Sequence, residues 1–177
     1  WDRENSCLRP FRIDTCGDVV FINLGGDGVS LRDWLGPVWE PSRTYGGVYR
    51  HSATWEKDFP CNWKVVLENS LESYHVPCLH RATFGDLPPE EKCEHDLDPR
   101  YTTFRTVEID NFATPFGRWA VRRMGLTPTG IYINHHIHPT VTFTSLDVFR
   151  FCQLFIPTSP ATCRHLGWLY TIRGTRR

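Results

Sequence analysis

The sequence lacks the features that mark several large classes of protein. Lysine plus arginine number 20 and aspartate plus glutamate also number 20, so the formal net charge is zero. A neutral chain offers no broad electrostatic surface for nucleic acid or an anionic membrane. No apolar run approaches the roughly 20 residues that cross a bilayer, and no secretory signal is visible. We therefore expect a cytoplasmic protein that binds neither nucleic acid nor a membrane.

The cysteines form neither a disulfide framework nor an iron–sulfur motif. There are 7 of them, an odd number scattered along the chain, so we expect reduced thiols. Cys-x-His occurs at Cys78, Cys93 and Cys163, but the CxxH that accompanies it in a Rieske centre occurs nowhere. These residues therefore hold no Rieske cluster, whereas a zinc site built from Cys78, His80, Cys93 and His95 stays open.

The chain is long and apolar enough for one domain and part of a second. It has 177 residues, of which 40% are hydrophobic. Helical signals lie at 31–38 after Ser30 and, most strongly, at 62–75, and a polar, proline-rich loop is expected at 85–100. Apolar or alternating runs predict strands at 18–24, 46–59, 101–109, 131–149, 150–157 and 165–172. Several antiparallel strands with one strong helix indicate an α+β fold.

The strong helix ends beside two histidines, His75 and His80, with Pro77 between them. On an unbroken helix, five residues would place the two rings roughly 140° apart. Because Pro77 disfavours helical geometry at Val76, the helix should end after His75. His80 can then turn back, and both imidazoles can reach one metal ion.

Two histidines and one carboxylate with open positions favour non-haem Fe(II) and oxygenase chemistry. Glu72 lies three residues before His75, so its carboxylate can orient that imidazole rather than bind the metal. The same spacing also fits structural histidines, zinc, or a nucleophilic Cys78. On the strand predicted at 131–149, the side chains of His136 and His138 should lie on the same face, where they would line a pocket or the surface.

Residues 61–80, CNWKVVLENSLESYHVPCLH, resemble the iron-binding segment of the large (alpha) subunit of Rieske non-haem iron ring-hydroxylating oxygenases. In that family NWK is followed by EN and then by an acidic residue-x-x-H-x4-H run. Weaker likenesses are RIDTCGDVVFINL to the last Rieske-domain strand, LRDWLGPV to the first catalytic-domain helix, and HPTVTF and FIPTSPATC to later strands. The matched positions in the main segment are Asn62-Trp63-Lys64, Glu68-Asn69, Glu72, His75 and His80.

The resemblance implies a helix-grip catalytic domain, in which an antiparallel sheet wraps round a long helix. It divides the chain into the tail of a Rieske domain, 1–28, and a mononuclear iron domain, 29–177, truncated at its C-terminus. It implies His75 and His80 as Fe(II) ligands, Glu72 as the link to the neighbouring subunit's cluster, and Asn69 as a pocket amide. The third ligand, an aspartate, is expected beyond residue 177, and neither Asp110 nor Asp147 is assigned to that role.

The implied activity is hydroxylation or demethylation of a small aromatic or similar organic substrate with O2. Electrons would come from a ferredoxin or reductase through a [2Fe–2S] cluster that this chain does not hold. The implied assembly is a homotrimer, which can include a beta subunit. By itself the chain should fold only partly and should not turn over. The alternatives are a helix-grip module that binds an apolar ligand without catalysis, or a zinc-binding domain.

Overall fold

The computed structural model describes residues 10–25, 28–43, 49–72, 74–79, 90–106 and 115–172. The chain divides into two compact units, Trp1–Tyr45 and Gly46–Arg177. The predicted domain boundary between residues 28 and 29 stays a prediction. Among the described helices, none is long and apolar enough to cross a membrane.

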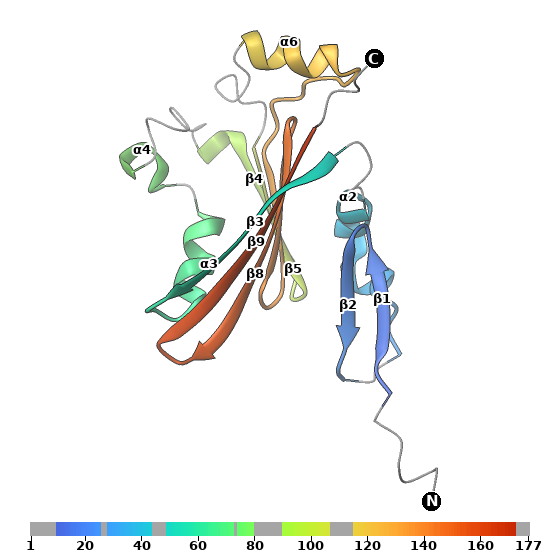
Figure 1. Cartoon of the computed structure of the whole chain (residues 1–177), viewed down its shortest axis with the longest axis vertical. Helices are drawn as coiled ribbons and strands as arrows, with labels where there is room; N and C mark the ends of the chain where they lie inside the picture. Colours follow the sequence, from blue (N-terminus) through green and yellow to red (C-terminus); the bar gives the residue numbers. More distant parts are fainter. Residues whose placement is uncertain are drawn as a thin grey trace, which may run out of the picture. The chain divides into compact units, whose positions relative to one another are not determined.

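The first unit begins with a two-stranded hairpin, β1 (Arg12–Cys16) and β2 (Val19–Asn23), visible at the blue end of the chain in Figure 1. Gly17 permits the tight turn because its φ is 60°, in the left-handed region. The strand predicted at 18–24 is thus confirmed. The short apolar run also favours a buried strand. That expectation is wrong, because Val20 and Ile22 are 61% and 57% exposed.

The capped helix predicted after Ser30 is confirmed as α1 (Leu31–Leu35). The Ser30 side chain accepts a hydrogen bond from the Asp33 N–H at 3.1 Å, which satisfies one donor of the first turn. Gly36-Pro37, a pair typical of a helix end, ends only α1. A 3-10 turn, η1 (Gly36–Val38), and then α2 (Trp39–Arg43) follow at once, because proline is tolerated in a first helical turn.

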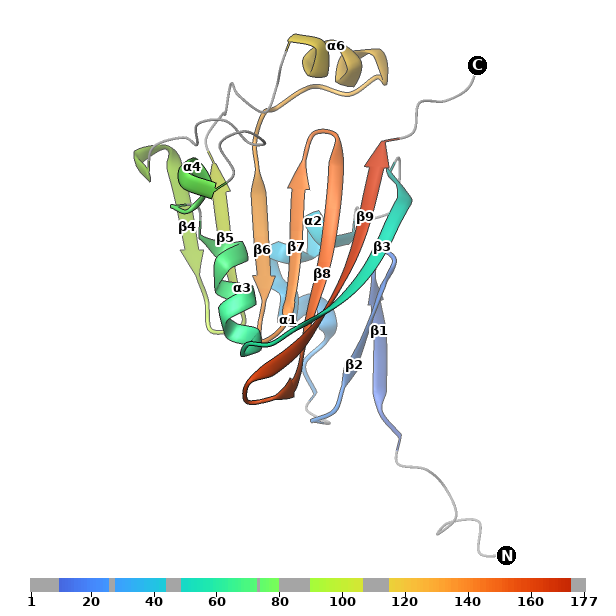
Figure 2. The same cartoon turned by 60° about the vertical axis from the view of Figure 1, so that its left-hand side comes forward.

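The second unit is built on one seven-stranded sheet in which all neighbouring strands are antiparallel. Its order is β3-β9-β8-β7-β6-β5-β4 (Figure 2). Except for β4, these strands fall within the ranges predicted from the sequence or extend them by a few residues. The single run predicted at 131–149, however, forms two strands, β6 and β7, which are joined by a turn and pair with each other. The bounds are β3 Tyr49–Phe59, β4 Cys93–Leu97, β5 Tyr101–Thr106, β6 Ile133–Ile137, β7 Val141–Leu146, β8 Phe149–Ser159 and β9 Thr162–Ile172.

Several elements of this unit were not expected. The predicted loop 85–100 is wrong where the chain forms η2 (Glu90–Lys92) and the edge strand β4, while 85–89 lie outside the described residues. The strand exists because its backbone pairs with β5, although its polar, mostly exposed side chains carry no strand pattern. A helix, α6 (Pro115–Arg123), follows β5; its leading proline and its last-turn arginines are ordinary helix signals.

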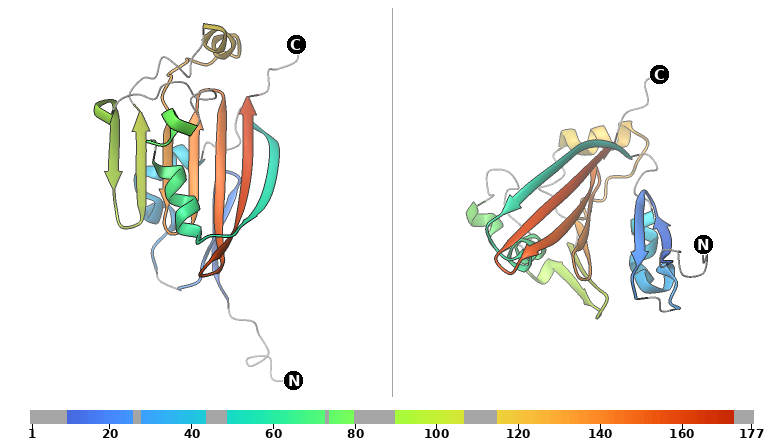
Figure 3. Two further views of the ribbon diagram at one scale, coloured as in Figure 1. Left: turned by 90° about the vertical axis from the view of Figure 1, so that its left-hand side faces the viewer. Right: turned by 60° about the horizontal axis from the view of Figure 1, so that its bottom comes forward.

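The helix α3 (Trp63–Leu71) lies along one face of the sheet and packs against β8 and β9 (Figure 3, left). Its Leu67 side chain is only 4% exposed. A single helix held against a broad antiparallel sheet confirms the α+β class and the helix-grip arrangement.

Candidate metal centre

The site is built at the end of α3, whose start is fixed by Asn62. The Asn62 side chain accepts from the Lys64 N–H at 3.0 Å and donates to the Pro160 carbonyl at 2.8 Å. The first bond caps the helix, and the second ties its start to the turn between β8 and β9. The direction of α3 across the sheet is therefore set at its first residue.

The helix ends earlier than the sequence predicts, at Leu71 rather than His75. The Glu72 N–H still donates to the Glu68 carbonyl at 3.2 Å, but Glu72 itself is extended, with φ −106° and ψ 161°. Pro77 does not end the helix. It lies in the first turn of a new short helix, α4 (Val76–Leu79), where a missing N–H costs nothing.

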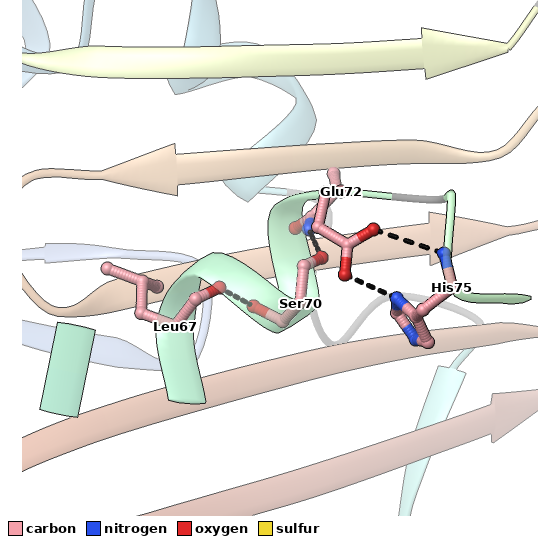
Figure 4. A network of polar contacts seen from close by, with 5 residues as sticks. Leu67, Ser70, Glu72 and His75 are labelled. Carbon is pink, nitrogen blue, oxygen red and sulfur yellow. Dashed lines mark hydrogen bonds and ion pairs between the residues drawn. The ribbon is translucent and has the colours of Figure 1, made fainter. Parts of the chain in front are cut away.

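The early helix end brings Glu72 against His75. Nδ1 of His75 is hydrogen-bonded to Oε1 of Glu72, and the His75 backbone N–H donates to Oε2 at 3.4 Å. Figure 4 shows the carboxylate and the ring facing each other across the turn. The side chains are 14% exposed for His75 and 23% for Glu72, so the contact is mostly shielded from water. The predicted partnership of these two residues is present.

This arrangement fits a metal ligand. A carboxylate accepts only, so Nδ1 of a neutral His75 carries the proton and Nε2 is the nitrogen that a metal would take. A histidine ligand held by a carboxylate is the usual arrangement at metal sites. The second predicted ligand, His80, lies outside the described residues. Among those that are described, no three His, Cys, Asp or Glu side chains are grouped to hold an ion.

The structure also shows where Asn69 and the acidic residues Glu68 and Asp147 lie. Asn69 and Glu68 lie on α3 with exposed side chains, and the pocket role of Asn69 stays a prediction. Asp147 is engaged in the turn between β7 and β8, where its carboxylate accepts from the Thr129 hydroxyl at 2.6 Å and the Gly130 N–H at 2.8 Å. Its oxygens therefore serve the fold, in keeping with its not being assigned as a ligand. Asp110 lies outside the described residues.

The histidines of β6 and its turn are structural contacts in this fold. The rings of His136 and His138 stack at 4.4 Å. Only His136 lies on β6, however, and His138 lies in the turn that follows, so the prediction that both lie on one strand is wrong for His138. Nε2 of His136 is 3.0 Å from the Pro139 carbonyl oxygen, and Nε2 of His138 is 3.2 Å from the Thr102 hydroxyl. Burial lowers the pKa of His136, so its ring tends to stay neutral.

The six described cysteines are free, as expected for reduced thiols. Cys93 and His95 lie on β4, where the His95 ring packs against Phe104 at 5.2 Å. The zinc group that would join them to Cys78 includes His80, and so lies partly outside the described residues. Burial raises the pKa of the Cys152 thiol to about 12, which keeps it protonated and inert.

A buried amide on β6, which no sequence pattern indicates, contacts the end of α3. Asn134 is 1% exposed and donates from Nδ2 to the Ser70 carbonyl at 2.8 Å, two residues before Glu72. The two residues are 64 positions apart in the chain. Only the strand pairing that places β6 beneath the helix end brings them together.

Comparisons with known proteins agree with this picture. The family model "Ring hydroxylating alpha subunit (catalytic domain)" matches residues 47–175. The carnitine monooxygenase oxygenase subunit of Acinetobacter baumannii is 28% identical over 105 residues, covering 58% of this chain and 28% of that protein. The anthranilate 1,2-dioxygenase large subunit of Burkholderia cepacia is 28% identical over 82 residues, covering 45% and 19%. The chain thus matches less than a third of the length of these relatives.

The fold is also similar to that of a solved structure. A crystal structure of a quaternary ammonium Rieske monooxygenase with an inhibitor superposes with a TM-score of 0.72 and 20% identity. The superposition covers 100% of this chain and 46% of that one. At this identity the likeness shows the fold alone, a helix held against an antiparallel sheet.

Proposed function

The chain belongs to the family of ring-hydroxylating alpha subunits, by its catalytic domain, and on this premise we propose that it is the oxygenase component of a Rieske-type system. The reaction is: substrate, O2, two electrons and two protons give hydroxylated substrate and water. The observation that carries the proposal is the Glu72–His75 pair at the end of α3. The electrons would come from a ferredoxin or reductase through a [2Fe–2S] cluster, in a trimer of alpha subunits.

The residues of this chain would have distinct tasks. His75, through Nε2, and His80 would hold Fe(II), which when bound supplies the binding and activation of O2. Glu72 holds the proton on Nδ1 of His75, fixes the ring plane and makes Nε2 a better donor. In the trimer, Glu72 would also face the cluster of the neighbouring subunit. Asn69 would contribute an amide to the pocket.

We propose a small organic substrate, with a quaternary ammonium compound favoured over an aromatic acid. Support comes from the relatives: one is named as a carnitine monooxygenase, and the solved structure described above is named as a quaternary ammonium Rieske monooxygenase. The anthranilate dioxygenase, with an aromatic acid, is the competing precedent. Hydroxylation of a methyl group on nitrogen would release formaldehyde, whereas ring dihydroxylation would give a diol.

The test uses the whole protein as its gene encodes it, loaded with Fe(II) and given hydrogen peroxide, which supplies both the oxygen atom and the electrons. Carnitine and anthranilate are offered separately, and products are identified by mass spectrometry. We expect oxidation of carnitine by the wild type and none by His75→Ala. Equal product from both proteins, or none from either substrate with iron bound, would contradict the proposed function.

A further inference from the structure

We propose that Asn134 is a positioning residue for the metal centre: its buried carboxamide pins the end of α3 to the sheet and so fixes Glu72 and His75. The link to the iron site rests on the proposed function. The link between Asn134 and the geometry of Glu72 and His75 does not, and the two are tested separately below.

The carboxamide is used at both ends. Nδ2 donates to the Ser70 carbonyl at 2.8 Å, and Oδ1 accepts from the Thr144 hydroxyl at 3.1 Å. A backbone carbonyl can only accept, so the amide orientation is determined by the contact with Ser70. Thr144, 3% exposed on the neighbouring strand, thus holds the oxygen and leaves the nitrogen aimed at the helix.

The Ser70 carbonyl needs such a partner. The last carbonyls of a helix receive no donor from the regular helical ladder. In α3 the Glu68 carbonyl still accepts from the Glu72 N–H, which leaves those of residues 69–71 outside the ladder. A glycine after the helix would satisfy them locally, but here Glu72 leaves α3 in an extended conformation. One of these carbonyls is instead paired with a side chain from the sheet. This ties the last turn of α3 to a rigid strand.

The tie acts at short range on the metal centre. Glu72 is two residues beyond Ser70, and His75 is held in turn by both oxygens of that carboxylate. A helix end held by one backbone bond of 3.2 Å tends to fray. A leucine at position 134 would pack as well without the cost of burying an amide. The contribution of the amide is therefore to position the end of α3, not to add apolar packing.

The same sheet contains a matched control, the amide of Gln153. It is 8% exposed, donates to the Thr142 hydroxyl at 3.0 Å and lies 3.0 Å from Nε2 of His165. It therefore makes two buried hydrogen bonds, like Asn134, but both partners are on strands. Loss of Gln153 should weaken the sheet without releasing α3.

The experiment compares amide hydrogen exchange in metal-free wild type, Asn134→Leu and Gln153→Leu. The measured quantity is the exchange rate of the Glu72 and His75 amides relative to that of the Phe155 amide in β8, which cancels global destabilisation. We expect this ratio to rise about three- to tenfold in Asn134→Leu, the effect of one lost buried hydrogen bond. It should stay unchanged in Gln153→Leu. An unchanged ratio in Asn134→Leu, or an equal rise in both variants, overturns the proposal.

The milder variant Thr144→Val, with Thr142→Val as its control, decides the matter if Asn134→Leu does not fold. It leaves the Asn134 donor in place but frees its oxygen, so a smaller rise in the same ratio is expected, and its absence overturns the proposal. A second readout is the affinity for Co(II) alone, which should fall about tenfold in Asn134→Leu and not in Gln153→Leu. A wild type that binds no Co(II) refutes the proposed function, while the exchange ratio still decides the role of Asn134.

Discussion

Both oxygens of the Glu72 carboxylate are directed at one residue, His75: Oε1 at its ring nitrogen Nδ1 and Oε2 at its backbone N–H, 3.4 Å away. His75 is therefore held at two points, one on its ring and one on its main chain (Figure 4). This geometry depends on the helix ending at Leu71, because an extended Glu72 turns its side chain along the path that the chain then follows.

The first prediction concerns the charge of Glu72. In Glu72→Gln the amide oxygen still accepts from Nδ1 of His75, so iron should be retained. The negative charge is lost, and turnover should fall by about 10- to 100-fold or more. The measurement is bound iron together with turnover number. Glu68→Gln, one helical turn earlier with an exposed side chain, is the control and should keep full activity. Near-normal turnover in Glu72→Gln would refute its role.

The second prediction tests whether the Asp147 carboxylate stabilises the fold or binds the metal. Its carboxylate accepts from the Thr129 N–H at 2.9 Å, the Thr129 hydroxyl at 2.6 Å and the Gly130 N–H at 2.8 Å. Asp147→Ala should lower the free energy of unfolding by about 1–3 kcal/mol, because these donors lose their partner. Iron bound per chain should not change. Loss of iron in a variant with normal urea stability would show that Asp147 is a ligand after all.

The third prediction concerns acid. Burial lowers the pKa of His135 from 6.5 to about 4, and its Nδ1 lies 2.9 Å from the Thr103 hydroxyl. Between those pH values the unfolded chain binds a proton at this residue that the folded chain does not. Stability therefore falls as the pH drops from 6.5 towards 4, by at most about 3 kcal/mol for this group, and levels off below the folded value.

Urea unfolding at several pH values between 7 and 4 measures this dependence. The variant His135→Gln cannot take up a proton, so its stability should decline less steeply than that of the wild type. Burial also lowers the pKa of His136 and His165, so part of the slope should remain. Identical slopes in wild type and variant would contradict the assignment to His135.

Much of the fold was accessible from the sequence because its signals are local. The alternating runs in β6 to β9 predict strands, and Ser30 and the apolar face of α3 predict helices, since each depends on neighbours a few residues away. The edge strand β4 was missed because CEHDL has no apolar alternation, and only its pairing with β5 makes it a strand. The end of α3 differs from the prediction because Pro77 is typical of a helix stop, whereas here it lies in the first turn of the next helix.

The candidate site likewise has one part that the sequence predicts and another that it does not. The partnership of Glu72 and His75 follows from a separation of three residues and could be predicted. Asn134 could not, because its partner Ser70 is 64 residues away and no motif links them. The roles of His80 and Asn69 stay predictions. Long-range hydrogen bonds depend on strand order and register, which the sequence pattern does not specify.

The most direct test of the account is the iron content of the whole protein, measured after anaerobic loading with Fe(II) in the presence of competing zinc. The wild type and the control His51→Ala, a change on β3, should each hold about one iron per chain in addition to the iron of the [2Fe–2S] cluster. His75→Ala and His80→Ala should hold almost none beyond the cluster iron, since a facial site does not survive loss of a ligand. Full iron in His75→Ala, or zinc in place of iron in the wild type, would contradict the proposal that these two histidines form a non-haem iron centre.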